Sequence, residues 1–332
     1  MIEHEEHHLD KIRDACAGCE LRIVPKNDRP EHIDPKVLSD VDVFIGNHPP
    51  SNFDDFKNLR WVQIVSAGYA HITHLPLVQR GIRVTNALGV FDSPIAEWNI
   101  MTMLMWERRM VEQLENQRNC VWDRAARFQS SLFGRTVGFV GYGGIARESA
   151  RLAKAMNLNV YAITRDDGAK SRDLVYRVEN TGDSEGKCVD RLFKMADMTE
   201  FLRDLDYLII TVPHTPQTEG MIGEQQLRAL KSSAVLINPA RAPIVNEEAL
   251  IRCLEESWIR GASVDVHYAY PLPSSHPLWQ MPNVILTPHV AGSDSNSHYL
   301  DRIYDIFTQN LHRYLGNVPL LNSLTEAQLL GH

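Results

Sequence analysis

Short apolar runs alternate with helix-like stretches along the chain. In the first hundred residues the runs are LRIV (21–24), VDVFIG (41–46), RWVQIV (60–65) and IRVTNA (82–87). Such runs, bounded by polar residues, are typical of buried strands, and strands that alternate with helices form parallel sheets with helices on both faces. The pattern therefore predicts a first α/β domain, although the chain opens on a helix where a strand is expected.

A second series of strand-like runs begins at Arg135. The runs are RTVGFV (135–140), NVYAI (159–163), YLIITV (207–212), AVLINP (234–239), GASVDV (261–266) and NVILTP (283–288), with helical stretches between most of them. This alternation predicts a doubly wound sheet. A chain of 332 residues also fits two domains of roughly 150 residues better than one core.

Two helices are clear from the pattern. The first begins at Ser93, a good N-cap residue, with Pro94 at the first helical position, where its missing N–H costs nothing. Its apolar residues run nearly all round, so we expect it to be buried between domains or in a subunit interface. The second is the C-terminal helix, whose apolar residues lie four apart in one stripe: Ile303, Phe307, Leu311 and Leu315.

Composition and charge exclude several classes of partner. The hydrophobic content of 44% and the charged content of 23% are ordinary for a globular protein. The formal net charge of −8 provides no basic surface for nucleic acid or anionic lipid. The N-terminus lacks the basic start and apolar run of a signal peptide, and no apolar run approaches about 18 residues. We expect a cytoplasmic protein with no nucleic-acid or membrane partner.

Cysteine and histidine residues near the N-terminus raise two further possibilities. The five cysteines are odd in number and scattered, which predicts free thiols in a reducing compartment, although Cys16 and Cys19 also have the spacing of a redox dithiol. The histidines at 4, 7 and 8 could bind a metal, but a solvated terminal segment is the favoured interpretation. No metal site is predicted.

A glycine-rich loop follows the first strand of the second series. Its pattern is Gly141-x-Gly143-x-x-Ala146, between a strand and a helix. Gly141 permits a tight turn, Gly143 allows the backbone to approach a pyrophosphate, and the small Ala146 allows close helix–strand packing. The helix N-terminus, with Gly144 and Ile145, offers free N–H groups to the phosphates. These features predict a dinucleotide site.

The end of the next strand bears on which dinucleotide binds. An NAD site normally has an acid here, but this chain has Thr164 and Arg165. Arginine suits a 2′-phosphate through its charge and forked donors. NADP(H) is therefore the preferred cofactor, and NAD(H) stays possible because Asp166 and Asp167 follow directly. The long polar segment 165–197 is interpreted as a surface insertion near the adenosine end of the cofactor.

Four ordered motifs carry a family resemblance: VSAGYAHI (65–72), LINPARAPIV (236–245), GASVDVHYAYPLP (261–273) and PLWQMPNVILTPHVAG (277–292). With the glycine loop they resemble the D-isomer-specific 2-hydroxyacid dehydrogenase family, particularly glyoxylate and hydroxypyruvate reductases. The resemblance implies an α/β protein of two domains, with a doubly wound Rossmann nucleotide-binding domain (105–296) inserted into a flavodoxin-like substrate domain (1–104 and 297–332). It also implies a homodimer.

The resemblance assigns roles to particular residues. Arg241 would bind the substrate carboxylate and polarise the keto oxygen, and His289 would be the acid in reduction and the base in the reverse direction. The backbone N–H groups of Ala67, Gly68 and Tyr69 would hold the substrate carboxylate. The remaining family positions line the cofactor cleft: Pro213, Thr218, Asn238, Ala240, Asp265 and Ala291.

Two positions depart from the family pattern. The usual Arg-Gly pair is Arg241-Ala242, and the catalytic glutamate, five residues after the aspartate, is replaced by Tyr270. A carboxylate beside a histidine raises the pKa of the imidazole, whereas a neutral tyrosine can only orient the ring. We therefore expect ketoacid reduction to fall off at lower pH than in glutamate-bearing relatives.

The expected function is NAD(P)-dependent reduction of a small 2-ketoacid to a 2-hydroxyacid. The main alternative, favoured by Tyr270 and Ala242, is a nucleotide-binding regulatory protein of the corepressor type with weak or no dehydrogenase activity. A formate-dehydrogenase-like activity is disfavoured, because that branch pairs its histidine with a glutamine.

Overall fold

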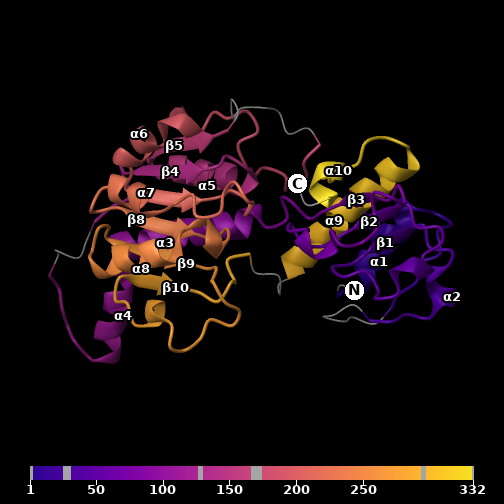
Figure 1. The fold of residues 1–332 in the computed structure, drawn as a ribbon, viewed down its shortest axis with the longest axis horizontal. Coiled ribbons are helices and arrows are strands. Elements are labelled where there is room, and N and C mark those ends of the chain that lie inside the picture. Colours follow the sequence, from indigo (N-terminus) through magenta and orange to yellow (C-terminus); the bar gives the residue numbers. More distant parts are fainter. Residues whose placement is uncertain (1–2, 25–30, 126–129, 166–173, 293–296, 331–332) are drawn as a thin grey trace. The chain divides into compact units, whose positions relative to one another are not determined.

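The computed structural model describes residues 3–24, 31–125, 130–165, 174–292 and 297–330. They form two compact units (Figure 1). Unit 1 comprises Met1–Phe91, Arg172–Glu179 and Ser293–His332, and unit 2 comprises Asp92–Ser171 and Asn180–Gly292. The chain thus passes between the units several times, and each unit has its own sheet.

Unit 2 contains a seven-stranded parallel sheet with the strand order β10-β9-β8-β7-β4-β5-β6. The strands are β4 (Thr136–Val140), β5 (Asn159–Thr164), β6 (Arg191–Lys194), β7 (Tyr207–Ile210), β8 (Val235–Asn238), β9 (Gly261–Val264) and β10 (Val284–Leu286). The order reverses between β4 and β7, which is the switch point of a doubly wound fold. The predicted α/β class and doubly wound sheet are confirmed.

Helices cover both faces of this sheet. One face packs on α3 (Asp92–Glu107) and α5 (Gly144–Ala155), and the other packs on α6 (Met198–Arg203), α7 (Glu224–Ala229) and α8 (Glu247–Glu255); α4 (Met110–Arg118) follows α3. Alternate residues of β7 enter opposite cores: Tyr207 and Ile209 lie in the first, Leu208 and Ile210 in the second. This period of two explains why the strands of a doubly covered sheet read as continuous apolar runs.

Unit 1 contains a three-stranded parallel sheet, β1-β2-β3. Its elements are α1 (Glu6–Ala15), α2 (Pro35–Leu38), β1 (Val43–Ile45), β2 (Trp61–Gln63), β3 (Arg83–Thr85), α9 (Ser297–Leu315) and α10 (Glu326–Leu329). Helix α9 buries Ile303, Phe307 and Leu311 as predicted, whereas Leu315, in its last position, is 54% exposed. The stripe therefore ends one turn earlier than the pattern indicated.

Two local predictions are wrong, and one strand was not predicted. Residues 21–24 form no strand, because this apolar run is largely exposed and pairs with no neighbouring strand among the described residues. Helix α3 begins at Asp92, so Ser93 lies inside its first turn and is not the N-cap. The polar segment 165–197 contains the edge strand β6, which buries only Phe193 and so has little apolar signal.

The boundary of the units differs from the expected 104/105. Helix α3 packs along α5 and belongs entirely to unit 2, so the first change of unit falls between Phe91 and Asp92. Leu174–Glu179, expected in the nucleotide domain, lies in unit 1, where Tyr176 is 3% exposed and donates its hydroxyl to Asp305 Oδ2 (2.8 Å).

The N-terminal cysteines and histidines are more structured than predicted. Cys16 and Cys19 form a disulfide across the end of α1, so the prediction of free thiols is wrong for this pair. His8 is 1% exposed rather than solvated: its Nδ1 accepts from Glu5 N–H (3.1 Å), and its Nε2 lies 3.1 Å from Asp301 Oδ1. With Nδ1 as an acceptor, Nε2 carries the proton toward Asp301, and His8 caps the first turn of α1.

Candidate active site

The candidate residues of unit 2 lie at one edge of its sheet. All seven strands are parallel, so their carboxyl ends share an edge. The glycine loop follows β4, Arg165 follows β5, Arg241 follows β8, Asp265 follows β9 and His289 follows β10. Ligands of doubly wound sheets bind at this edge, beside the switch point.

The glycine loop has the backbone that a pyrophosphate site needs. Gly141 has a φ of 87°, which favours glycine, and a Cβ there would lie 2.7 Å from Val212 Cγ1. Gly144 lies against the Asp92 carboxylate, so a side chain at this position would collide with it. Helix α5 begins at Gly144 after the N-cap Gly143, which has no side chain with which to cap the helix. Its first-turn N–H groups therefore suit an anion.

The residues beyond β5 lie where the sequence predicts the adenosine end of the cofactor. Thr164 is the last residue of β5, and Arg165 follows it as an exposed side chain. An exposed guanidinium at this edge can meet a 2′-phosphate without a desolvation cost to a buried charge. Asp166 and Asp167, the acids of the NAD alternative, lie outside the described residues.

The loop after β7 is closed by a threonine. Thr218 Oγ1 donates to Pro213 O (2.8 Å) and accepts from Thr215 N–H (2.8 Å). The two predicted cofactor positions of this loop, Pro213 and Thr218, are thus hydrogen-bonded to each other and form one rigid turn beside the switch point.

A buried asparagine holds the loop after β8, which carries Arg241. Asn238 is 2% exposed; its Oδ1 accepts from Ala240 N–H (3.1 Å), and its Nδ2 donates to Arg241 O (3.1 Å). Arg241 is exposed, and Ala242 is buried in a 3-10 turn, Ala242–Ile244. Ala242, the departure from the family pattern, therefore packs inward while the guanidinium stays accessible.

His289 lies in a turn that a buried carboxylate holds. Asp265 is 1% exposed and accepts three hydrogen bonds, from Thr287 Oγ1 (2.6 Å), Val290 N–H (2.9 Å) and Ala291 N–H (2.9 Å). His289 has a φ of 59°, a strained conformation for a non-glycine residue. Such strain persists only where the surroundings enforce it, and it is common at functional sites. We call Thr287–Ala291 the histidine turn.

Tyr270 contacts the ring of His289 directly. Its hydroxyl lies 2.8 Å from His289 Nδ1 and accepts from His267 N–H (3.3 Å). His267 is itself buried, with Nε2 2.8 Å from Thr287 O. The structure therefore brings Tyr270, Asp265 and His289 together around one turn.

In unit 1, the predicted carboxylate loop follows β2. Ser66 Oγ donates to Gly68 O (2.8 Å), and Asn86 Nδ2 donates to Ala67 O (2.8 Å). In the described part of the chain, the N–H groups of Ala67, Gly68 and Tyr69 have no protein acceptor. With its carbonyls held and its amides unused, the loop suits an anion.

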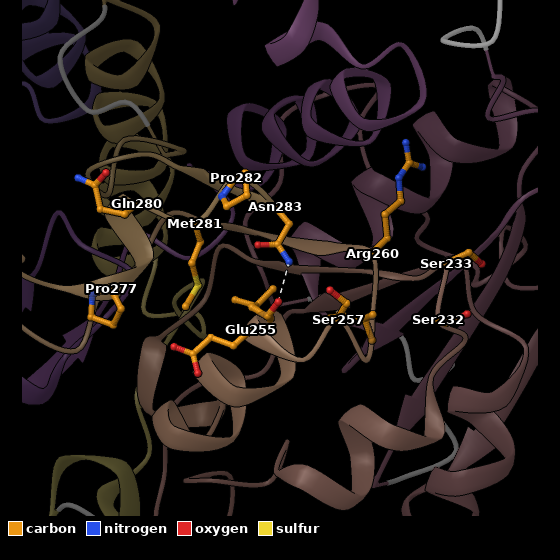
Figure 2. Close-up of a pocket in the computed structure, with 12 residues that line it drawn as sticks. Ser232, Ser233, Glu255, Ser257, Arg260, Pro277, Gln280, Met281, Pro282 and Asn283 are labelled. Carbon is orange, nitrogen blue, oxygen red and sulfur yellow. Dashed lines mark hydrogen bonds between the residues drawn. The ribbon is translucent and has the colours of Figure 1, made fainter.

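The pocket drawn in Figure 2 lies at the other edge of the sheet of unit 2. Ser232 and Ser233 precede β8, Arg260 precedes β9, and Asn283 precedes β10, so these lining residues stand at the amino ends of the strands. Arg260 Nη1 is 3.2 Å from Glu107 Oε1, in a partly buried ion pair. This pocket is therefore not part of the candidate active site.

Sequence reasoning missed two residues that hold the site. Thr287 donates to Asp265, and its signal was only its place in the last motif. Asp183 accepts from Tyr142 OH (2.7 Å), a contact between residues 41 positions apart, for which the local sequence has no signal.

The comparison with protein families agrees with this geometry. The family model described as D-isomer specific 2-hydroxyacid dehydrogenase, NAD binding domain, matches residues 100–291. The chain belongs to the D-isomer-specific 2-hydroxyacid dehydrogenase family. It is therefore an NAD(P)-dependent 2-hydroxyacid oxidoreductase, and unit 2 holds the nicotinamide cofactor.

Individual dehydrogenases show the same likeness. A glyoxylate reductase from Thermofilum pendens is 33% identical over 271 residues, covering 80% of this chain and 75% of that protein. A solved dehydrogenase of this family from Xanthobacter autotrophicus, in complex with NADPH and MES, has a TM-score of 0.78 and 24% identity over 99% of this chain and 96% of that one. An NADPH-dependent glyoxylate/hydroxypyruvate reductase from Sinorhizobium meliloti, with NADP and sulfate, has a TM-score of 0.71 and 24% identity over 89% and 87%. The two solved structures support the fold.

The described residues include no helix that is both long and apolar enough to cross a membrane. The cytoplasmic location of this dehydrogenase stays a prediction.

Proposed function

We propose that this dehydrogenase reduces a small 2-ketoacid, of the glyoxylate or hydroxypyruvate type, to the 2-hydroxyacid. When bound, the nicotinamide would supply a hydride to the carbonyl carbon, so residues of this chain must deliver a proton to the carbonyl oxygen. The histidine turn carries the proposal: His289 is held in a strained conformation by buried Asp265, with Tyr270 on its ring. The name of the glyoxylate reductase that is 33% identical supports this substrate class.

In the proposed mechanism, His289 and Arg241 act on the same oxygen. His289 donates the proton as the hydride arrives and takes it back in the reverse reaction. The guanidinium of Arg241 binds the substrate carboxylate through paired donors and stabilises the charge that develops on the oxygen. Their loops leave the same sheet edge after β8 and β10, with Asp265 after the strand between them, which supports this division of roles.

Tyr270 is proposed as a positioning residue in place of the family's glutamate. Its hydroxyl can accept a hydrogen bond from a protonated Nδ1 while it also accepts from His267 N–H. The phenol thereby fixes the plane of the imidazole and keeps the opposite nitrogen, Nε2, as the proton donor. Unlike a carboxylate, it adds no negative charge that would favour the imidazolium form.

For the cofactor, we propose NADP(H) in preference to NAD(H). Exposed Arg165 directly after β5 supports this choice, and both solved relatives cited above hold NADPH or NADP. The phosphates would lie on the N–H groups of Gly144 and Ile145. The nicotinamide half would lie along the remaining cleft positions: Pro213, Thr218, Asn238, Ala240, Asp265 and Ala291.

Unit 1 is proposed as the substrate domain. The N–H groups of Ala67, Gly68 and Tyr69 would bind the substrate carboxylate, because the carbonyls of the first two are already engaged by Asn86 and Ser66.

The experiment that tests the function compares two exposed arginines. NADPH and NADH oxidation would be measured with a panel of 2-ketoacids for the wild type, Arg241→Ala and Arg165→Ala. Arg241→Ala should lower kcat/KM for the ketoacid by about 100-fold or more. Arg165→Ala should raise KM for NADPH by about 10-fold and leave KM for NADH nearly unchanged.

The outcomes separate the alternatives. Nucleotide binding without turnover of any ketoacid would contradict the reductase proposal and favour the regulatory alternative. Equal loss of NADPH and NADH affinity in Arg165→Ala would contradict the proposed 2′-phosphate contact.

We also propose a homodimer formed through α3 and α4. These helices expose a run of large apolar side chains, each between 37% and 49% exposed: Met101, Leu104, Met110, Val111 and Leu114. Large apolar side chains exposed close together in the sequence support a subunit interface at these two helices. Val111→Glu should shift the mass measured by light scattering to that of a monomer, whereas Leu192→Glu, on edge strand β6, should leave it unchanged.

A further inference from the structure

Tyr142 occupies the variable position between the first two glycines of the cofactor loop, and its side chain points into the protein. It is 8% exposed, and its hydroxyl donates to Asp183 Oδ2 (2.7 Å). Burial, and then this hydrogen bond, raise the pKa of the phenol. Tyr142 is therefore a neutral donor throughout the physiological range.

Asp183 is fixed by its own segment. The residue is 7% exposed, and its carboxylate also accepts from Lys187 N–H (2.8 Å) and Cys188 N–H (2.9 Å). Two backbone donors and one phenol thus satisfy this buried carboxylate. Such a hydrogen-bonded buried carboxylate is held in place, because moving it would take the acceptor away from the phenol and from two backbone N–H groups at once.

Arg147, in the first turn of α5, completes the cluster. It is 5% exposed; its guanidinium stacks 4.8 Å from the centroid of the Tyr142 ring, its Nε donates to Tyr142 O (3.3 Å), and its Nη1 donates to Asp183 O. The backbone carbonyl and the ring of the loop tyrosine are therefore both held.

The segment that carries Asp183 follows α5 along its length. Near the start of the helix, Glu148 Oε2 accepts from Gly182 N–H (2.5 Å), and at its end Lys154 Nζ is 2.9 Å from Asp190 Oδ1. We call Asn180–Asp190 the brace. It is part of the polar insertion for which the sequence suggested no role.

We propose that Asp183 is a positioning residue for the cofactor: through Tyr142 and Arg147 the brace holds the glycine loop in the conformation that receives the pyrophosphate. The inference deepens the proposed function and rests on nucleotide binding at this loop. Its physical basis is preorganisation, since a loop ordered during folding loses little conformational freedom when the ligand binds. Tyr142 and Asp183 need not touch the nucleotide.

The chain contains a matched control. Tyr176 OH donates to Asp305 Oδ2 (2.8 Å) in unit 1, and Tyr176 is 3% exposed. This second tyrosine–aspartate pair has the same chemistry, nearly the same length and a similarly buried tyrosine, but its aspartate is exposed, and the pair lies outside the glycine loop and the brace. A loss that reflects only a missing buried hydrogen bond should appear in both phenylalanine variants.

The test measures NADPH affinity by titration calorimetry, and thermal stability, for the wild type, Tyr142→Phe, Asp183→Asn and Tyr176→Phe. We expect Tyr142→Phe to raise Kd for NADPH by about 5- to 10-fold, with a smaller rise for Asp183→Asn, which keeps an acceptor. At saturating NADPH, kcat should stay within about twofold of the wild type, because the reacting groups are not altered. Tyr176→Phe should leave Kd unchanged, with a smaller loss of stability because water can reach the exposed Asp305.

Two results would overturn the inference in distinguishable ways. If the wild type binds NADPH and Tyr142→Phe binds it equally well, the brace is only structural and the proposed function stands. If the wild type binds no nicotinamide nucleotide, the proposed function fails and the inference fails with it.

Discussion

The histidine turn and the glycine loop, both at the carboxyl edge of the sheet of unit 2, each contact a buried aspartate. Each aspartate accepts hydrogen bonds from the same kinds of donor. Asp265 accepts one hydroxyl, from Thr287, and two backbone N–H groups in the histidine turn. Asp183 accepts one hydroxyl, from Tyr142, and two backbone N–H groups in the brace. The chemistry of the two supports is therefore alike, and what differs is the group that each one places.

The two aspartates differ in which backbone segment their carboxylates bind. Asp265 bonds to the backbone of the turn that contains His289, so it determines where a proton donor stands. Asp183 bonds to the backbone of its own brace and reaches the glycine loop only through a side chain, so it determines how a binding loop is shaped. Disturbing the first should mainly lower the rate of the chemical step, and disturbing the second should mainly weaken nucleotide binding.

The largest expected effect comes from Asp265→Ala. It leaves Val290 and Ala291 N–H without an acceptor, which should cost roughly 2–4 kcal/mol of unfolding free energy. Release of the turn should lower kcat by about 100-fold or more, because a displaced His289 no longer meets the substrate oxygen.

Steady-state kinetics and denaturant unfolding would check this, with Asp183→Ala as the partner variant. Asp183→Ala should raise Kd for NADPH and change kcat much less. If both variants change kcat and Kd in the same proportion, the proposed difference between the two aspartates is wrong.

A change of intermediate size is expected at Tyr270. Tyr270→Glu places a carboxylate on Nδ1 of His289, where it favours the imidazolium form. Because reduction needs the protonated histidine, the fall in kcat/KM on the alkaline side should move up by about one pH unit. Tyr270→Phe adds no charge, so it should lower the rate by about 3- to 10-fold and leave the midpoint in place.

The measurement is a pH profile of kcat/KM for a 2-ketoacid, with Kd for NADPH determined at each pH as the control. A Tyr270→Glu profile that overlays the wild type would rule out control of the His289 proton through this contact.

The smallest expected effect is a pH dependence of stability, which we expect for the Tyr142–Asp183 contact and not for the Thr287–Asp265 contact. The pKa of Tyr142 is raised by burial and by Asp183, whereas in the unfolded chain the phenol ionises near its ordinary value of about 10. Above that pH the unfolded state binds fewer protons, so the wild type loses stability as pH rises. Tyr142→Phe lacks this titration. The difference in unfolding free energy between the wild type and this variant should therefore narrow by up to about 1.4 kcal/mol per pH unit above pH 10.

Thermal unfolding of the wild type and Tyr142→Phe at pH 8 and at pH 10.5 would check this. Thr287→Val, which removes the hydroxyl on Asp265, is the control, because an aliphatic hydroxyl does not titrate in this range and its stability gap should stay constant. A constant gap for Tyr142→Phe would show that this phenol ionises alike in both states.

Much of the molecule was predictable because its signals are local. The strands of unit 2 are continuous apolar runs since helices cover both faces of the sheet, and the Gly141-x-Gly143-x-x-Ala146 spacing reports a turn whose backbone needs those residues. Asp265 lies at the end of one predicted strand, and Arg241 and His289 come within two residues after two others, so parallel pairing places all three at one edge. Their roles as substrate, cofactor and proton-transfer residues stay proposals.

Other features could not be predicted from the sequence, because the contacts behind them join distant positions or bury few apolar side chains. Edge strand β6 buries one side chain, so its pattern resembles a loop. Helix α3 was divided at residue 104 by analogy, whereas its packing on α5 places it in unit 2. His8 was expected in solvent, although it is buried against Asp301, which follows almost three hundred positions later.

Residue type and spacing within one element or one connection were enough to predict the fold class, the cofactor loop and the short set of residues that carry the proposed chemistry. The contacts that hold those residues arise from tertiary packing: Tyr270 meets His289 Nδ1, Asp265 holds the histidine turn, and Asp183 reaches the glycine loop. Such contacts depend on which segments pack together, and the free energy of burying a polar side chain with its partners is a property of that packing and of no single stretch of chain.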